Sequence, residues 1–266
     1  AVVRSAQKVT SAMRVVANVN LRWGKEVLKH AEHSWSFFQE VWSQICRDVP
    51  LYDRALSQAH DHAEKALVIV LTSNRGLCGA YHNITAKTAL NLCQRLNLPV
   101  DIALIGKKNA SMLLPQFVYD FPRSSYFQHD IHQLGDMLLS KLAVYQSIYV
   151  VYQNFTNVLT QTPCAELIYP LSEPQAQNPS SKAWLYEGSA VSVSQHMSRY
   201  VFHMHLFWCF CHHVVGDSAA RLVAMDTASQ SAKKIQKELM LIYNRLRQDM
   251  ITRELVEVVS GASEAM

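Results

Sequence analysis

The 266-residue chain lacks several features that would assign it to a simple class of protein. No apolar run reaches the roughly 18 residues of a membrane-spanning helix, so the sequence predicts no span. Its six cysteines are scattered and form no CxxC pair, which is typical of reduced thiols rather than of a secreted disulfide framework. The net charge of +4 is too small to indicate nucleic-acid binding by itself.

The sequence also lacks the common phosphate-binding motifs, since neither GxxxxGK[ST] nor GxGxxG occurs. A glycine-bearing loop at residues 73–79 (SNRGLCG) does follow an apolar strand pattern, and such loops can bind an anion. We interpret Gly76 and Gly79 as turn residues between a strand and a helix. A phosphate- or nucleotide-binding enzyme remains the alternative, with Cys78 beside Arg75 as a candidate nucleophile that has no paired base in the sequence.

A long regular helical pattern dominates the end of the chain. Residues 218–260 contain no proline or glycine, and they predict a rod of about 60 Å at about 1.5 Å per residue. A rod of this length needs a partner of equal length or a cavity to enclose it. Its apolar positions alternate steps of three and four residues, and they are Met225, Ala228, Ala232, Ile235, Leu239, Ile242 and Leu246.

A second seam with the same spacing begins the chain. Its positions are Val2, Ala6, Val9, Met13, Val16, Asn20, Trp23 and Val27, continued through His30, Ser34, Phe37 and Val41. Two such seams at opposite termini predict an antiparallel coiled coil, with Asn20 fixing the register and the C-terminal tip projecting alone. Two amphipathic helices of a larger globular core remain the alternative.

The middle of the chain alternates strand and helix patterns. Strands are predicted at residues 66–72, 100–105, 116–119, 147–154 and 165–171, and helices at 83–96, 107–114 and 131–143. This alternation predicts an α/β fold with a small, mostly parallel, Rossmann-like sheet inserted between the halves of the coiled coil. The expected divisions are residues 1–47 and 191–266 for the two coiled-coil helices and 48–190 for the inserted domain.

Histidines cluster in three places along the chain, and the last cluster, at residues 203–213, also holds Cys209 and Cys211. Structural zinc sites usually show matched Cys or His pairs at fixed spacing, and these clusters do not. We therefore interpret them as packing residues and expect neither a metal nor another cofactor.

Three stretches resemble the gamma subunit of the F-type ATP synthases, the central rotor shaft. They are residues 218–261, with AARLVAM at 219–225 and LIYNRLRQ at 241–248, residues 71–79 (LTSNRGLCG) and residues 8–17 (KVTSAMRVVA). Residues 184–187 (WLYE) also fit a position of the family. The chain departs from the family pattern at Ala80, where a glycine is usual, and in the aromatic and histidine-rich residues 201–215.

The resemblance implies a rod inside a hexamer of alternating alpha and beta subunits, with an inserted domain standing on the membrane c-ring beside delta- or epsilon-type subunits. The chain itself would be non-catalytic and peripheral to the membrane, without nucleic acid. Matching positions imply a foot on the ring at Trp184, Tyr186 and Glu187. The implied contacts to the catalytic hexamer are Met13, Arg221, Arg247, Gln248, Thr252 and Glu254.

The resemblance also sets an expected compartment. Because the chain begins at Ala1 without a methionine and is divergent, we expect a removed leader and the matrix side of the mitochondrial inner membrane. The cytoplasmic side of a bacterial plasma membrane is the alternative. A non-rotary coiled-coil scaffold also remains open.

Overall fold

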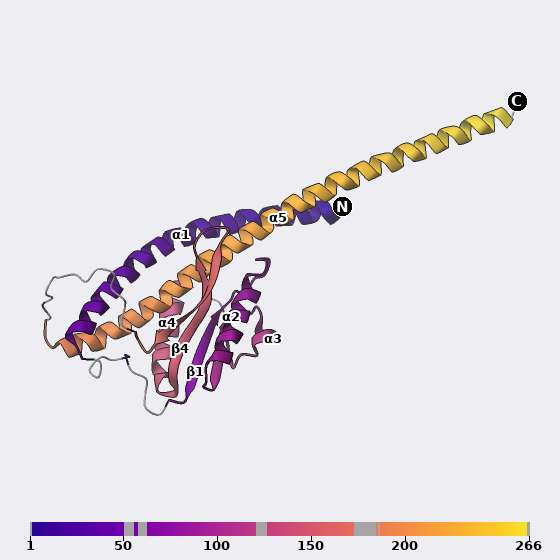
Figure 1. Cartoon of the computed structure of the whole chain (residues 1–266). Coiled ribbons are helices and arrows are strands. Elements are labelled where there is room, and N and C mark those ends of the chain that lie inside the picture. The colour runs from indigo at the N-terminus through magenta and orange to yellow at the C-terminus, as the bar shows by residue number, and fades with distance from the viewer. Residues whose placement is uncertain are drawn as a thin grey trace.

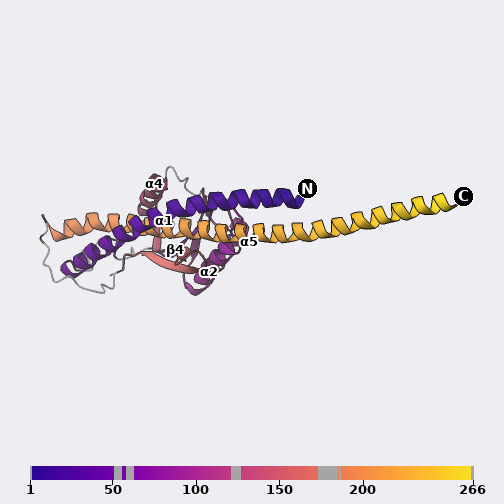
Figure 2. The same ribbon diagram turned by 90° about the horizontal axis from the view of Figure 1, so that it is seen from above.

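The computed structural model describes residues 2–50, 56–57, 63–120, 127–172, 185 and 187–264. Two long helices, α1 (Val2–Asp48) and α5 (Ala190–Glu264), begin and end the chain. They run in opposite directions, so that the N-terminus lies beside the middle of α5 (Figures 1 and 2). The coiled coil predicted for the two termini is confirmed, together with the α/β class of the inserted domain.

In the described part of the chain between α1 and α5 there are five strands and four shorter helices. The strands are β1 (Lys65–Leu71), β2 (Val100–Ile105), β3 (Phe117–Tyr119), β4 (Tyr145–Phe155) and β5 (Gln161–Tyr169). The helices are α2 (Tyr81–Arg95), α3 (Ala110–Leu113), α4 (Phe127–Ser140) and the 3₁₀ turn η2 (Leu142–Val144).

The strands form one sheet in the order β3-β2-β1-β4-β5, parallel except for β5, which runs antiparallel to β4. The central strand β1 is apolar from Ala66 to Leu71 because both faces of the sheet are covered. On one face Val68 and Val70 pack with Ala86 and Ala89 of α2. On the other face, the alternate residues of β1 join a core shared with α1, α4 and α5.

Over most of α1 the predicted seam was wrong by one residue, although its last position, Val41, is buried as predicted. Up to residue 31 the buried positions are Ala17, Leu21, Gly24, Leu28 and Ala31, each one residue after a predicted position. The predicted seam residues lie outward instead: Val16 is 50% exposed, and Met13, Asn20 and Trp23 are also exposed. Three of these positions, Ala17, Gly24 and Ala31, have small residues, and they allow the helices to approach closely. An added Cβ at Gly24 would lie 3.1 Å from Val215 Cγ2 of α5.

The seam residues of α5 are buried where α1 lies beside them and exposed further along the helix. Met225 is buried against α1, and Arg14 of α1 forms a 2.8 Å ion pair with its neighbour Asp226. Beyond the reach of α1, Ile235, Leu239, Ile242 and Leu246 are between 47% and 57% exposed. The end of α5 therefore projects without a partner helix among the described residues (Figure 1). Within the described residues, no helix is both long enough and apolar enough to span a bilayer.

Candidate functional site

The projecting part of α5 exposes side chains of every kind on all sides. Every residue from 237 to 256 is exposed, and α1 covers none of this stretch. Large apolar side chains surround the helix rather than forming one stripe, so one partner helix could not cover them. An extended exposed apolar surface marks an interaction site. Because this surface surrounds the helix, a partner that covers it has to enclose the helix. The apolar side chains are Leu239, Met240, Leu241, Ile242, Tyr243, Leu246, Met250, Ile251, Leu255 and Val256.

Four of the predicted contact residues lie together on this projecting stretch of α5 (residues 237–256), which we call the tip. Arg247 and Glu254 are seven residues apart and share one face of the helix, and Gln248 and Thr252 are four apart on an adjacent face. All four side chains are exposed, and the Thr252 hydroxyl donates to the Gln248 carbonyl oxygen at 2.9 Å. Within the described part of the chain, no ion pair within 4.0 Å involves Arg247 or Glu254. Their charged groups are therefore free to bind another subunit.

The other two predicted contact residues lie away from the tip. Met13 is a 37% exposed residue of α1. Arg221, on α5, is turned to its own chain: its Nη2 lies 2.8 Å from Asp217 Oδ2, and its Nε donates to the Gly76 carbonyl oxygen at 3.1 Å. Arg221 therefore holds the loop after β1 (residues 73–79) against α5, and only 13% of the Arg221 side chain is exposed.

The backbone of this loop turns sharply, with positive φ at Leu77 (67°) and Gly79 (61°) but not at Gly76. A leucine in the left-handed region is unusual, and no sequence signal indicated it. The loop presents acceptors towards α5, since the Gly76 carbonyl oxygen and Ser73 Oγ (3.4 Å) both face Arg221. This arrangement binds a guanidinium group of the same chain.

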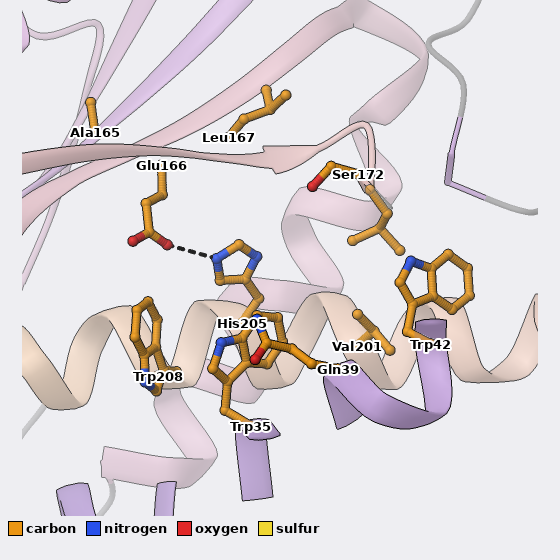
Figure 3. A pocket seen from close by; sticks show the side chains of 11 residues that line it. Trp35, Gln39, Trp42, Ala165, Glu166, Leu167, Ser172, Val201, His205 and Trp208 are labelled. Carbon is orange, nitrogen blue, oxygen red and sulfur yellow. Dashed lines mark hydrogen bonds and ion pairs between the residues drawn. The ribbon is translucent and has the colours of Figure 1, made fainter. Parts of the chain in front are cut away.

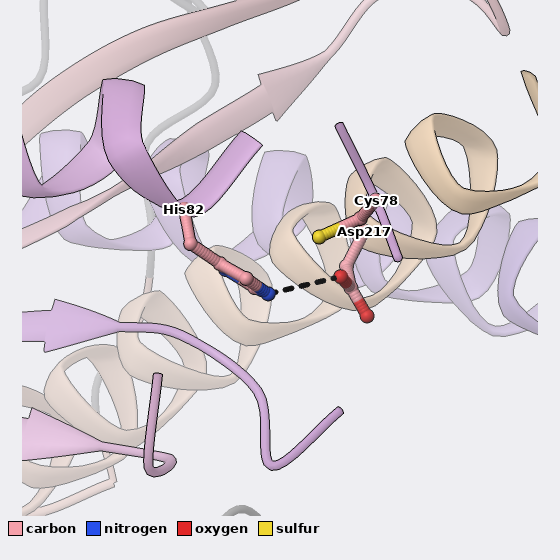
Figure 4. A group of neighbouring side chains, drawn as sticks. All are labelled: Cys78, His82 and Asp217. Carbon is pink, nitrogen blue, oxygen red and sulfur yellow. Dashed lines mark ion pairs between the residues drawn. The ribbon is translucent and has the colours of Figure 1, made fainter. Parts of the chain in front are cut away.

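The structure does supply the base that the sequence did not offer for Cys78. His82, one helical turn away, and Asp217 of α5 lie beside the thiol, with His82 Nε2 3.5 Å from Asp217 Oδ1 (Figure 4). Burial, reinforced by the charge of Asp217, raises the pKa of the Cys78 thiol to about 11. The thiol is therefore protonated at neutral pH, and it is only 4% exposed. A nucleophile needs the thiolate and access to a substrate, so this group is a poor catalytic site.

The predicted foot residues are only partly described. Trp184 and Tyr186 lie outside the described residues, whereas Glu187 and its neighbour Leu185 are exposed. These two residues lie just before the start of α5, and that start is at the end of the molecule opposite the C-terminus (Figure 1). With 75 residues, α5 is about 110 Å long, and it separates foot and tip by nearly that distance.

The histidine-rich segment is mostly buried, as a packing interpretation requires, but it also forms polar clusters that sequence reasoning missed. His203 meets His132 and Asp136 of α4, and His205 and Cys209 meet Glu166 of β5. The carboxylates come from elements far away in sequence, so spacing along the chain gave no signal for either cluster.

Comparisons with known proteins agree with this architecture. A family model described as ATP synthase matches residues 1–265. The ATP synthase gamma chains of Bartonella bacilliformis and Sinorhizobium medicae are each 28% identical to this chain, over 98% of its length and 95% and 94% of theirs.

Two solved structures have the same fold. One is a chain of the central stalk and c-ring of the Tetrahymena thermophila mitochondrial ATP synthase, with a TM-score of 0.61 and 16% identity over 83% of this chain and 99% of that chain. The other, from the Euglena gracilis mitochondrial ATP synthase, has a TM-score of 0.55 and 15% identity over 95% and 94%. With a family match over almost its whole length, the chain belongs to the ATP synthase family, as a gamma chain.

Proposed function

We propose that this chain is the central-stalk rotor subunit of an F1Fo ATP synthase, which couples rotation of a membrane ring to the catalytic sites of a surrounding hexamer. The observation that carries the proposal is the unpartnered tip of α5, exposed at every residue from 237 to 256. A continuous helix whose apolar and charged groups face all directions fits a cavity that encloses it. The chain supplies no catalytic group in this role, and the chemistry belongs to the hexamer.

The tip acts by being asymmetric. A shaft can change the state of a catalytic site only if it contacts the alternative states differently. One straight helix inside three catalytic subunits presents a different face to each subunit, so the three sites become unequal. Turning the shaft exchanges those faces, and each site passes in sequence through binding, reaction and release by rigid-body displacement.

Specific contacts come from the polar residues of the tip. We propose that Arg247, Gln248, Thr252 and Glu254 bind loops of the catalytic subunits. Hydrogen bonds that involve a charged group are directional and strong enough to define a resting position, and they can break and re-form at each step. Met13 and Arg221 are proposed to face the same hexamer near its lower opening, with Arg221 also holding the loop after β1 on the shaft.

The opposite end of the molecule is the proposed attachment to the membrane ring. Exposed Leu185 and Glu187 support this placement, and we extend it to Trp184 and Tyr186. Delta- or epsilon-type central-stalk subunits would bind beside this foot. We infer the matrix side of the mitochondrial inner membrane, because the similar solved structures are mitochondrial. The bacterial gamma chains among its relatives keep a bacterial plasma membrane as the alternative.

The proposal is tested by purifying the complex through a tag on this chain and assaying its ATPase activity. Alpha and beta subunits and the ring should copurify. Changing both Arg247 and Gln248 to alanine should lower turnover at least ten-fold, because a single hydrogen bond to a charged group contributes about 1.5–3 kcal/mol.

The matched control changes Gln94 and Arg95 to alanine, since these residues form the same pair of exposed types on α2 of the inserted domain. This control should keep full activity. Unchanged turnover in the Arg247 and Gln248 variant would refute the tip contacts. Copurification of no hexamer would refute the rotor role and favour a scaffold.

A further inference from the structure

A cavity of about 430 Å³ lies between the sheet edge and the two long helices. Aromatic side chains of α1 and α5, Trp35, Trp42 and Trp208, form much of its wall. Two ionisable groups meet inside it: Glu166 projects from β5 towards His205 on α5 (Figure 3). An ionisable pair facing a cavity with space for small ligands is an arrangement that packing alone does not require.

A third group completes the arrangement. Cys209 lies one helical turn after His205 on α5, so both side chains reach towards β5. Glu166 Oε2 is 2.9 Å from His205 Nε2 and 3.9 Å from Cys209 Sγ. One ligand atom from each residue lies within 4.8 Å of the other two. Around a tetrahedral zinc ion, such atoms are separated by roughly 3.3–3.6 Å, so the two distances from Glu166 Oε2 each lie within about half an ångström of those in a zinc site.

We propose that Glu166, His205 and Cys209 bind one divalent metal ion of the zinc type. A carboxylate, an imidazole and a thiolate form a mixed O, N and S donor set, which selects zinc-like ions over Mg²⁺ and Ca²⁺. Three protein ligands leave a fourth position for a water molecule from the cavity. On binding, the Cys209 thiol releases its proton to solvent and coordinates as the thiolate.

Neighbouring groups already hold two of the ligands in place. The Tyr152 hydroxyl donates to Glu166 Oε1 at 2.8 Å, which leaves Oε2 directed at His205 and Cys209. The Trp35 ring stacks on the His205 imidazole with centroids 4.5 Å apart. Such outer contacts orient ligands in metal sites and strengthen binding.

Two further clusters of potential ligands are weaker candidates. At Cys78, His82 and Asp217, the Arg221 guanidinium lies 2.8 Å from the Asp217 carboxylate and would repel a cation. The cluster of His132, Asp136 and His203 on α4 and α5 has no thiol, and its His132 side chain is 64% exposed. The site between β5 and α5 combines a thiol, an enclosing cavity and oriented ligands. A bound ion there would join the sheet to the shaft.

The experiment titrates Co²⁺ into the full chain, after treatment with a chelator and under reducing conditions. Cobalt bound to a thiolate gives a near-ultraviolet charge-transfer band, which a site without cysteine cannot give. We expect this band in the wild type at one ion per chain, and we expect Zn²⁺ to displace it. Cys209→Ser should abolish the band. Cys211→Ser, at a buried thiol two residues further on and outside the cluster, should retain it, as should Cys78→Ser.

A second variant keeps the test informative if Cys209→Ser does not fold. Glu166→Gln keeps the size of the side chain but removes its charge, and it should weaken Co²⁺ binding at least ten-fold while the thiolate band persists at saturation. It should also reduce the rise in unfolding temperature that a fixed Zn²⁺ concentration gives the wild type. Absence of the band in the wild type, its loss in Cys78→Ser, or unchanged affinity in Glu166→Gln would each overturn the proposal.

Discussion

At the scale of single residues, Arg221 and Asp217 join the loop after β1 to the shaft. Their side chains are 13% and 10% exposed and 2.8 Å apart. Arg221→Ala would leave a buried carboxylate without its cation, so we expect a loss of about 3–5 kcal/mol in the free energy of unfolding. Chemical denaturation measures this loss.

The ion pair of Arg14 with Asp226 is the matched control, because it has the same 2.8 Å separation but side chains that are 44% and 41% exposed. Arg14→Ala should cost no more than about 1 kcal/mol, since solvent already screens these charges. Equal losses for the two arginines would show that burial of the Arg221 pair contributes nothing.

A buried histidine makes the fold sensitive to acid. His213 is fully buried, its Nε2 lies 3.2 Å from the Thr72 carbonyl oxygen, and burial lowers its pKa to about 3. Below about pH 6.5 the His213 imidazole binds a proton in the unfolded chain but not in the folded chain. The free energy of unfolding therefore falls as the pH drops from about 6.5 towards 3. One such group contributes a slope of up to about 1.4 kcal/mol per pH unit.

His213→Gln should therefore reduce the loss of stability between pH 7 and pH 4, as measured by urea denaturation at each pH. The dependence of the unfolding free energy on pH should become weaker but should not disappear. Burial also lowers the pKa of His82 and His212, so these two histidines contribute to the same dependence. Exposed His33 is the control, and His33→Gln should leave the slope unchanged. An unaltered slope in His213→Gln would mean that His213 is protonated in the folded chain.

At the scale of elements, the seam of α1 depends on small residues. Ala17 is fully buried against α5, so Ala17→Leu should push the helices apart and lower stability by about 1–3 kcal/mol. Ala12→Leu makes the same change at an exposed position of the same helix, and its effect should stay within about 0.5 kcal/mol. Thermal unfolding of both variants tests the corrected seam, and equal midpoints would argue against it.

The sequence predicted the two long helices, the strands of the sheet and the projecting tip, because spacing and apolar runs are local properties. It misplaced the seam of α1 because steps of three and four residues fit two neighbouring seams equally well, whereas close helix packing favours the one that contains Ala17 and Gly24. The tip residues could be proposed only from a resemblance. Glu166 could not be foreseen beside His205, since their contact depends on how β5 packs against α5.

At the scale of the whole molecule, the core and the tip are separable. Residues 237–256 are all exposed, so they contribute little to the buried core. A chain that ends at residue 236 should keep the unfolding temperature of the full chain within a few degrees but bind the hexamer more weakly. Calorimetry and copurification measure the two effects. A large drop in the unfolding temperature would show that the tip folds back onto its own chain.

Rotation of this chain inside its hexamer is the measurement that tests the central claim most directly. Leu185→Cys places a reactive thiol at a fully exposed position of the proposed foot, whereas the six native cysteines are all buried or half-buried. With the hexamer fixed to a surface and a probe on this thiol, ATP should drive rotation in one direction with three steps per turn, one for each catalytic site. A probe that only fluctuates while the same hexamer hydrolyses ATP would contradict the rotor and leave the chain a static scaffold.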